Sequence, residues 1–287
     1  MFKALSPLLL IAVLAAPARA QSLVEPVAWS LRLTQEQGVT YRGLASFDKA
    51  GKGATNTTYV MPGVAGTVLA VAAHGLLINN GLRQQKSEIE LRADQVLEPY
   101  LPVLGAVSQQ ELMTQALARA RTGSARKLIS HLDMDEQGWI VESAPVFFMT
   151  QDQGALILEN VIAVYRPGAM RQASYTNTVR VVSRLVEHED LPTYWNAAQG
   201  EPLRRHSAAL LAMSFDIALA QAQADAAAPA ASAFRTVRYQ QGGKEVAERA
   251  QVLGEQCARV LIKNLRGWLM SVPLGRSAVP DGCAAES

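Results

Sequence analysis

The chain has 287 residues, of which 27 are Lys or Arg and 25 are Asp or Glu, and 49% of its residues are apolar. Charged residues make up 18%, below the typical level of about 25%, so the composition supports a sizeable folded core and excludes a globally disordered chain. The chain as a whole also lacks the basic excess that nucleic-acid phosphates select, and we therefore expect no nucleic-acid partner.

The first twenty residues have the pattern of a secretory signal peptide. Lys3 precedes an apolar run over residues 8–16, and residues 18–20 read Ala-Arg-Ala, which matches a cleavage site. The run is too short to span a bilayer, and Gln21 stands where a lipid-anchored protein would have Cys. We expect cleavage after Ala20 and export to the periplasm of a bacterial envelope. Because this segment contains Lys3, Arg19 and no acid, the mature chain has 25 basic and 25 acidic residues.

The two cysteines, Cys257 and Cys283, would then lie in a compartment where disulfides persist. A bond between them would close a loop of about 27 residues and raise the free energy of unfolding by about 3 kcal/mol in the chain-entropy model. The alternative is two unrelated thiols, one buried and one in a polar tail. The sequence has no C-x-x-C pair, so we expect no thioredoxin-like role and no zinc site. It also has no P-loop and no G-x-G-x-x-G pattern, and we expect no cofactor.

Hydrophobic periodicity and turn residues predict the elements of the N-terminal half. Residues 27–48 alternate apolar and polar side chains around Gly38, which predicts a β-hairpin. Residues 82–104 predict a polar helix that Pro99 and Pro102 break or kink. The Ser108-x-x-Glu111 pattern is a capping box and predicts the start of a second helix. The first helix carries an apolar stripe made of Ile89, Ala93, Val96, Leu97, Tyr100, Leu101 and Leu104.

Residues 60–78 are almost entirely Gly, Ala, Val and Leu. A helix that is apolar on all sides is buried in protein or in lipid. The 16 residues from 63 to 78 fall short of the roughly 20 that span a bilayer, and His74 in their middle would be a further penalty. We favour a core helix. The alternative is membrane insertion or a helix-packing face at Gly66 and Ala70.

A strand-like period begins near residue 127 and predicts most of the sheet. Short turns separate the first four strands, and such loops join antiparallel neighbours, because a parallel crossover requires a dozen residues or more. A helix over about 201–222, an Ala/Pro linker near 224–233 and C-terminal strands follow, with Gly242-Gly243 as a tight turn. We predict a single α+β domain over 21–287, an antiparallel meander sheet with helices packed on one face. The predicted strands are 127–132, 139–150, 155–165, 175–186, 234–240, 245–253 and 258–272.

Local motifs for chemistry are sparse. Asp133, Asp135 and Gln137 match the first ligands of a calcium loop, but Ala144 replaces the glutamate that closes the coordination shell. We keep these three residues as a weak metal candidate beside the simpler interpretation of an acidic turn. His206 and Ser207 are neighbours on a helix and would not face each other. The acidic run 187–190 indicates a solvated loop at the end of a strand.

The segment that contains Trp268, Leu269 and Met270 is densely apolar. It predicts either the end of a core strand or an exposed edge that docks a partner. Export and the lack of a catalytic motif favour a non-catalytic binding or assembly module with a protein partner in the cell envelope. The alternatives are a membrane-associated component of an envelope complex, attached through 60–78, and an enzyme whose residues are scattered in the sequence.

Overall fold

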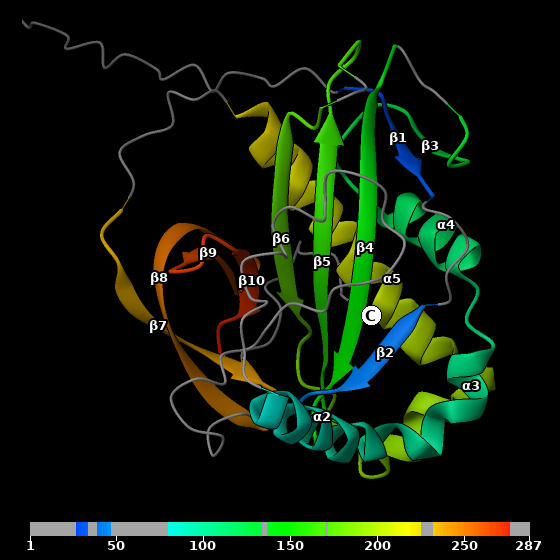
Figure 1. Cartoon of the computed structure of the whole chain (residues 1–287), viewed down its shortest axis with the longest axis vertical. Coiled ribbons are helices and arrows are strands. Elements are labelled where there is room, and N and C mark those ends of the chain that lie inside the picture. Colours follow the sequence, from blue (N-terminus) through cyan, green and yellow to red (C-terminus); the bar gives the residue numbers. More distant parts are fainter. Residues whose placement is uncertain are drawn as a thin grey trace, which may run out of the picture.

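The computed structural model describes residues 27–33, 39–46, 80–133, 137–169, 172–224 and 232–275. The predicted signal peptide, the apolar segment 60–78 and most of the Ala/Pro linker lie outside these described residues. The described strands form one ten-stranded sheet. Figure 1 shows that its long central strands lie in front of a long helix. In the described part of the chain, no helix has the length and hydropathy needed to cross a membrane.

The sheet has the strand order β3-β1-β4-β5-β6-β10-β9-β8-β7, and β2 pairs with β4 beside β1. The strands are β1 (Trp29–Arg32), β2 (Thr40–Gly43), β3 (Arg126–Ile129), β4 (Trp139–Met149), β5 (Leu156–Tyr165), β6 (Tyr175–Val182), β7 (Arg235–Gln241), β8 (Lys244–Gln256), β9 (Arg259–Asn264) and β10 (Leu269–Pro273). The helices are α2 (Asn80–Asp94), the 3-10 helix η2 (Gln95–Tyr100), α3 (Leu101–Gly105), α4 (Gln109–Arg119) and α5 (Leu191–Gln223). The fold therefore combines helices and strands, as predicted.

The prediction of a purely antiparallel meander is wrong. β4, β5 and β6 are antiparallel neighbours, but β1–β3, β1–β4, β2–β4 and β6–β10 are parallel pairs. The predicted hairpin over 27–48 does not form either, because β1 and β2 both pair with the same edge of β4. They lie opposite residues 139–142 and 146–149. Pro145, which has no amide hydrogen to donate, lies in the gap between these two stretches.

The strands β4, β5 and β6 bury side chains on both faces. One face packs against α4 and α5, through residues such as Phe147, Leu158 and Val181 on the strands and Leu211 and Phe215 on α5. The other face packs against the curled strands β7–β10, through Phe148, Ile157 and Val182 on the sheet and Tyr239 and Ile262 opposite them. Figure 1 shows this curled part at one side of the three long strands. Burial on both faces explains the nearly continuous apolar sequence of these strands.

A chain of buried hydrogen bonds fixes α5 on the sheet. Asn160 of β5 is fully buried, and its amide donates to Ser214 Oγ of α5 at 2.9 Å. The amide oxygen of Asn160 accepts from Ser143 Oγ of β4 at 2.9 Å. Asn160 Oδ1 and Ser214 Oγ both have hydrogen-bond partners in this network. The network therefore fixes the position of the helix without leaving either atom unsatisfied.

A sharp kink divides α5. Residues 198–200 have left-handed φ values of 48°, 58° and 82°. Pro202 begins the second part, where a missing amide hydrogen is tolerated. That second part confirms the predicted helix over 201–222. Gly200 contacts α3 so closely that a Cβ atom added to it would lie 2.8 Å from Cβ of Val103. The kink therefore places α3 directly against α5.

Candidate functional site

The residues that the sequence singled out for metal binding do not assemble into a site that the structure describes. Asp133 Oδ2 accepts a hydrogen bond from the Ser130 amide at 2.9 Å and closes a local turn. Gln137 lies in the bend before β4, and Asp135 lies outside the described residues. Within the described ranges, no group of three or more His, Cys, Asp or Glu side chains is arranged to hold a metal ion.

The predicted interaction segment is an interior strand. β10 lies between β6 and β9, and Trp268, Leu269 and Met270 are 9%, 2% and 2% exposed. This burial fits the core-strand interpretation and not an exposed edge. Cys257 lies in the turn between β8 and β9. Its predicted disulfide partner, Cys283, lies outside the described residues, so the disulfide stays a prediction.

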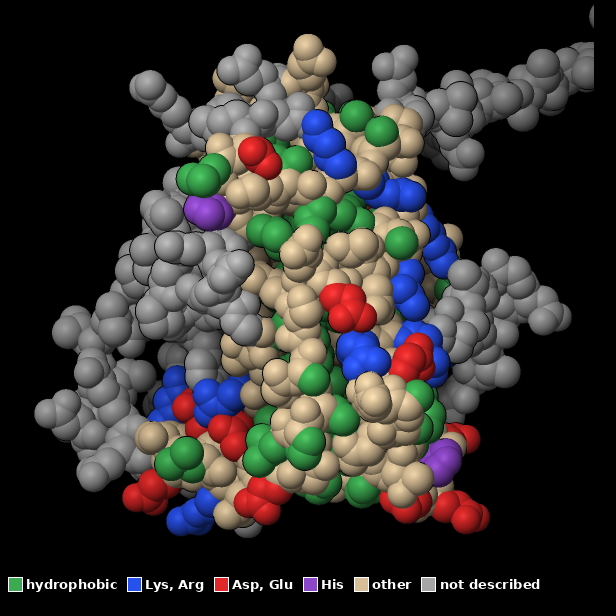
Figure 2. Space-filling view, turned by 90° about the vertical axis from the view of Figure 1, so that its right-hand side faces the viewer, with side chains coloured by type: hydrophobic (Ala, Val, Ile, Leu, Met, Phe, Trp, Pro, Cys, Tyr) green, Lys and Arg blue, Asp and Glu red, His purple; other side chains and the backbone are tan. Residues whose placement is uncertain are grey.

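An apolar surface lies at the end of the molecule that carries α3. All five residues of α3 escape full burial, and Leu101 is 61% exposed. The kink of α5 borders it, because the Asn196 amide donates to the Pro99 carbonyl at 3.1 Å. Figure 2 shows apolar side chains gathered at the lower end of this side of the molecule. The members of this α3 surface are Pro99, Leu101, Pro102 and Leu104 with Ala197 and Ala198.

The exposure of this surface follows from a break in the helical period. Val96, Leu97 and Tyr100 of the predicted apolar stripe are buried, as expected for a continuous helix, but Leu101 is not. The chain forms a 3-10 helix over Gln95–Tyr100, which has three residues per turn instead of 3.6. The residues that follow are therefore rotated out of the stripe. The sequence signal for this change is the pair Pro99 and Pro102, which predicted a break but not its direction.

Two buried aromatic residues anchor the α3 surface to one residue of the β4–β5 turn. The Tyr100 hydroxyl donates to Gln153 Oε1, and the Trp195 indole donates to the Gln153 carbonyl at 2.8 Å. Both aromatic side chains are fully buried. Burial, together with the nearby Asp190 carboxylate, raises the pKa of Tyr100 to about 12, so its hydroxyl remains a donor. Sequence reasoning did not find Gln153, which lies in an ordinary polar turn.

Acidic residues border the apolar surface. Glu98, Glu187, Glu189 and Asp190 are exposed, and Figure 2 shows acidic side chains along the lower rim of the molecule. Asp190 caps α5, because its carboxylate accepts the Thr193 hydroxyl at 2.6 Å and the Thr193 amide at 3.0 Å. These hydrogen bonds lower the pKa of Asp190 and keep it ionised. The rim therefore carries negative charge at neutral pH.

A histidine lies behind the surface but has no nucleophile as a partner. His206 Nε2 and the Tyr194 hydroxyl share a hydrogen bond of 3.0 Å, and the Trp195 ring lies 5.1 Å from the imidazole. Burial, with a smaller effect of the Arg205 charge, lowers the pKa of His206 to about 4. Ser207 bonds instead to the Tyr41 hydroxyl at 2.9 Å. As predicted, the adjacent His206 and Ser207 do not face each other.

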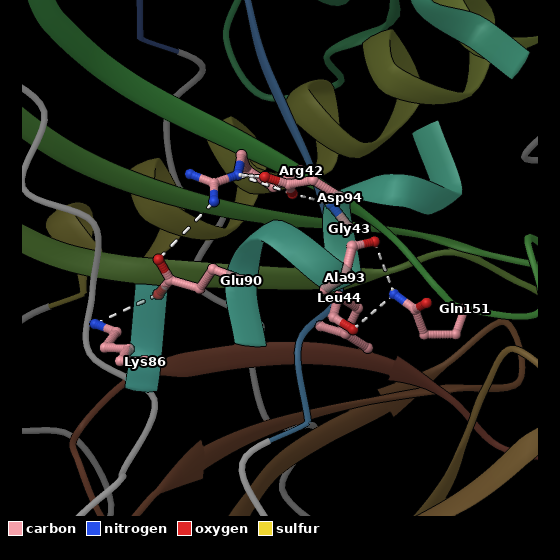
Figure 3. Close-up of polar contacts among 8 residues, drawn as sticks. All are labelled: Arg42, Gly43, Leu44, Lys86, Glu90, Ala93, Asp94 and Gln151. Atoms are coloured by element: carbon pink, nitrogen blue, oxygen red, sulfur yellow. Dashed lines mark hydrogen bonds and ion pairs between the residues drawn. The ribbon is translucent and has the colours of Figure 1, made fainter. Parts of the chain in front are cut away.

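A charged cluster joins α2, which leads directly into η2 and α3, to the sheet (Figure 3). Arg42 of β2 donates to both Asp94 oxygens at 2.9 and 2.8 Å, and the Gly43 amide donates to Asp94 Oδ1 at 2.8 Å. Gln151 donates to the Leu44 and Ala93 carbonyls, each at 3.1 Å. These bonds fix the end of α2 and, through it, the start of the segment that forms the α3 surface.

Comparison with known proteins finds no matching family model, no curated relative and no similar solved structure. The geometry of the described residues therefore carries the functional argument. It offers one exposed apolar surface, fixed from behind by aromatic anchors and bordered by acids.

Gly43→Ala is expected to destabilise the protein, because a Cβ atom at this position would lie 1.8 Å from the Ala93 carbonyl oxygen. We expect the free energy of unfolding, measured with urea, to fall by roughly 2–4 kcal/mol. Gly105→Ala is the matched control, because no atom lies within 4 Å of its added Cβ. A similar small change in both variants would show that α2 does not pack on β2 as described.

The pKa of His206 predicts a loss of stability in acid. An unfolded histidine titrates near 6.5, whereas folded His206 titrates at about 4, so the unfolded chain binds the proton more tightly. The contribution of neutral His206 to the free energy of unfolding is complete above about pH 6.5 and decreases as the pH falls toward 4. Between about pH 7 and pH 4.5 we expect a loss of about 2 kcal/mol that His206→Gln removes. Equal losses in the wild type and this variant, measured by urea unfolding, would contradict the assignment.

Proposed function

We propose that this chain is an exported, non-catalytic binding or assembly module of the cell envelope that binds a protein partner through the α3 surface. The observation that supports it best is α3 itself, a helix of sequence Leu-Pro-Val-Leu-Gly in which no residue is buried. Exposed apolar surfaces of this kind mark interaction sites in soluble domains. The acidic rim around it gives the arrangement of an interface, with an apolar centre and a polar border.

The rigidity of the surface supports binding. Tyr100 and Trp195, both fully buried, attach its two halves to Gln153. A surface that is already fixed in the free protein loses little conformational entropy when a partner binds. The proline residues at 99 and 102 restrict the backbone further. The α3 surface is therefore suited to bind a partner in the conformation that the free chain already has.

The rim suggests the chemistry of the partner. Glu98, Glu187, Glu189 and Asp190 carry negative charge around an apolar centre. A complementary polypeptide would present apolar side chains flanked by Lys or Arg, because opposite charges at a rim accelerate encounter and disfavour wrong partners. The polar side chains near the surface are hydrogen-bonded within the protein: His206 bonds to Tyr194, and Ser207 bonds to Tyr41. This supports a binding role rather than acyl transfer at that position.

The test compares two exposed leucines. Leu101 is 61% exposed on α3, and Leu265 is 68% exposed in the turn between β9 and β10. A photo-crosslinking amino acid at position 101, introduced into the full chain in cells, is expected to yield an adduct with a protein that contains a basic-flanked apolar segment. The same probe at position 265 is expected to yield none.

Affinity for the identified partner is then measured with purified variants. Leu101→Asp is expected to weaken binding at least about tenfold, since a buried leucine contributes about 1.5–3 kcal/mol, and to leave the melting temperature unchanged. Leu265→Asp is expected to bind like the wild type. Equal binding by both variants, or adducts at position 265 only, would reject the α3 surface as the binding site.

A further inference from the structure

A second charged surface lies where α4 leads into β3. Arg119 ends α4, Arg121 lies in the connection and Arg126 begins β3. All three are exposed, and we call these three arginines the basic surface. The sequence has no acidic residue between Glu111 and Asp133. Figure 2 shows basic side chains along the upper part of the side of the molecule whose lower rim is acidic. A chain with balanced charge thus concentrates positive charge at one place.

The backbone of this segment is fixed. The Trp29 indole donates to the Thr122 carbonyl at 2.8 Å, and Asp216 of α5 accepts the Arg121 and Thr122 amides at 3.0 and 2.8 Å. Gly123 has a φ of +97°, and a Cβ atom there would lie 2.6 Å from Cδ1 of Trp29. The three arginines therefore lie in, or directly beside, a rigid turn wrapped around a buried tryptophan.

The acids nearest in the fold do not neutralise these arginines. The Asp216 oxygens bind backbone amides, and Glu142 pairs with Arg32 at 2.7 Å on the face of the sheet opposite α5. Glu111 lies at the start of α4 and accepts from Gln115 at 3.2 Å. Among the described residues, the guanidinium groups of Arg119, Arg121 and Arg126 take part in no ion pair. Their charge is available to an external anion.

We infer that the basic surface binds the anionic head groups of a phospholipid membrane. Arginine matches phosphate oxygens with paired donors, and several basic side chains on a fixed surface are attracted to an acidic leaflet. Leu132, 77% exposed just beyond β3, can enter the apolar part of the interface, a contact that a nucleic-acid backbone does not offer. Residues 119–133 contain no Phe, Tyr or Trp for base stacking, and Trp29 is only 1% exposed.

This inference does not depend on the proposed function, because the two surfaces are separate. Asp216 follows Gly200 along α5 by 16 residues, which corresponds to about 24 Å at the rise of an α-helix. A membrane could therefore contact the basic surface while a protein partner contacts the α3 surface.

The experiment is sedimentation of the mature chain with phospholipid vesicles. One set contains phosphatidylcholine only, and the other contains one third phosphatidylglycerol. The test variant replaces Arg119, Arg121 and Arg126 together by Ser. The control replaces Arg235, Arg238 and Arg249 by Ser, three exposed arginines of β7 and β8, and so removes the same charge elsewhere. Circular dichroism confirms that both variants are folded.

We expect binding to the anionic vesicles only, weakened by high salt. The test variant should lower the partition coefficient on the order of 100-fold, and the control should stay close to the wild type. No binding to anionic vesicles at low salt, or an equal loss in both variants, would overturn the inference. Tighter binding to duplex DNA than to the vesicles would also overturn it and would assign the basic surface to another polyanion.

Discussion

Three consecutive residues of the β4–β5 turn hold three separate parts of this fold. Gln151 bonds to the carbonyl groups of Leu44 and Ala93 and so connects β2 with α2. Asp152 accepts the Gly243 amide at 2.6 Å and fixes the tip of the β7–β8 hairpin. Gln153 binds Tyr100 and Trp195. Burial opposes ionisation of Asp152, but hydrogen bonds from Thr150, Gly243 and Gly154 lower its pKa. The charged form that binds the hairpin is thereby favoured.

This turn matters because β4, β5 and β6 need a cover on each face. α5 supplies one cover through a continuous apolar stripe, and the curled strands β7–β10 supply the other. Neither cover is adjacent in sequence to the turn that holds it, so the fold depends on contacts between distant segments. The Asp152–Gly243 bond joins residues 91 positions apart. Such contacts close long loops and add to the non-local character of the fold.

The sequence predicted the features that depend on neighbouring residues. The Ser108 side chain accepts the Glu111 amide, and Gly242-Gly243 forms the β7–β8 turn. It failed where distant strands pair, because nothing local in 27–48 indicates that β1 inserts between β3 and β4. It also failed at the candidate site. Periodicity assigned the apolar stripe to one continuous helix, but the proline residues and the 3-10 helix rotate the residues that follow out of this stripe. In the α5 kink, two residues other than glycine adopt left-handed φ values, which the sequence does not indicate.

Composition concealed the two surfaces for a simple electrostatic reason. Residues 21–287 contain equal numbers of acidic and basic residues, and net charge reports only their difference. The fold separates part of that charge, with acids around the start of α5 and arginines beside its later turns. At physiological salt, electrostatic interactions between exposed charges are screened over a Debye length of about 8 Å. Two surfaces about 24 Å apart therefore act independently. A chain with nearly balanced charge can therefore carry an acidic rim and a separate basic surface, and α5 sets the distance between them.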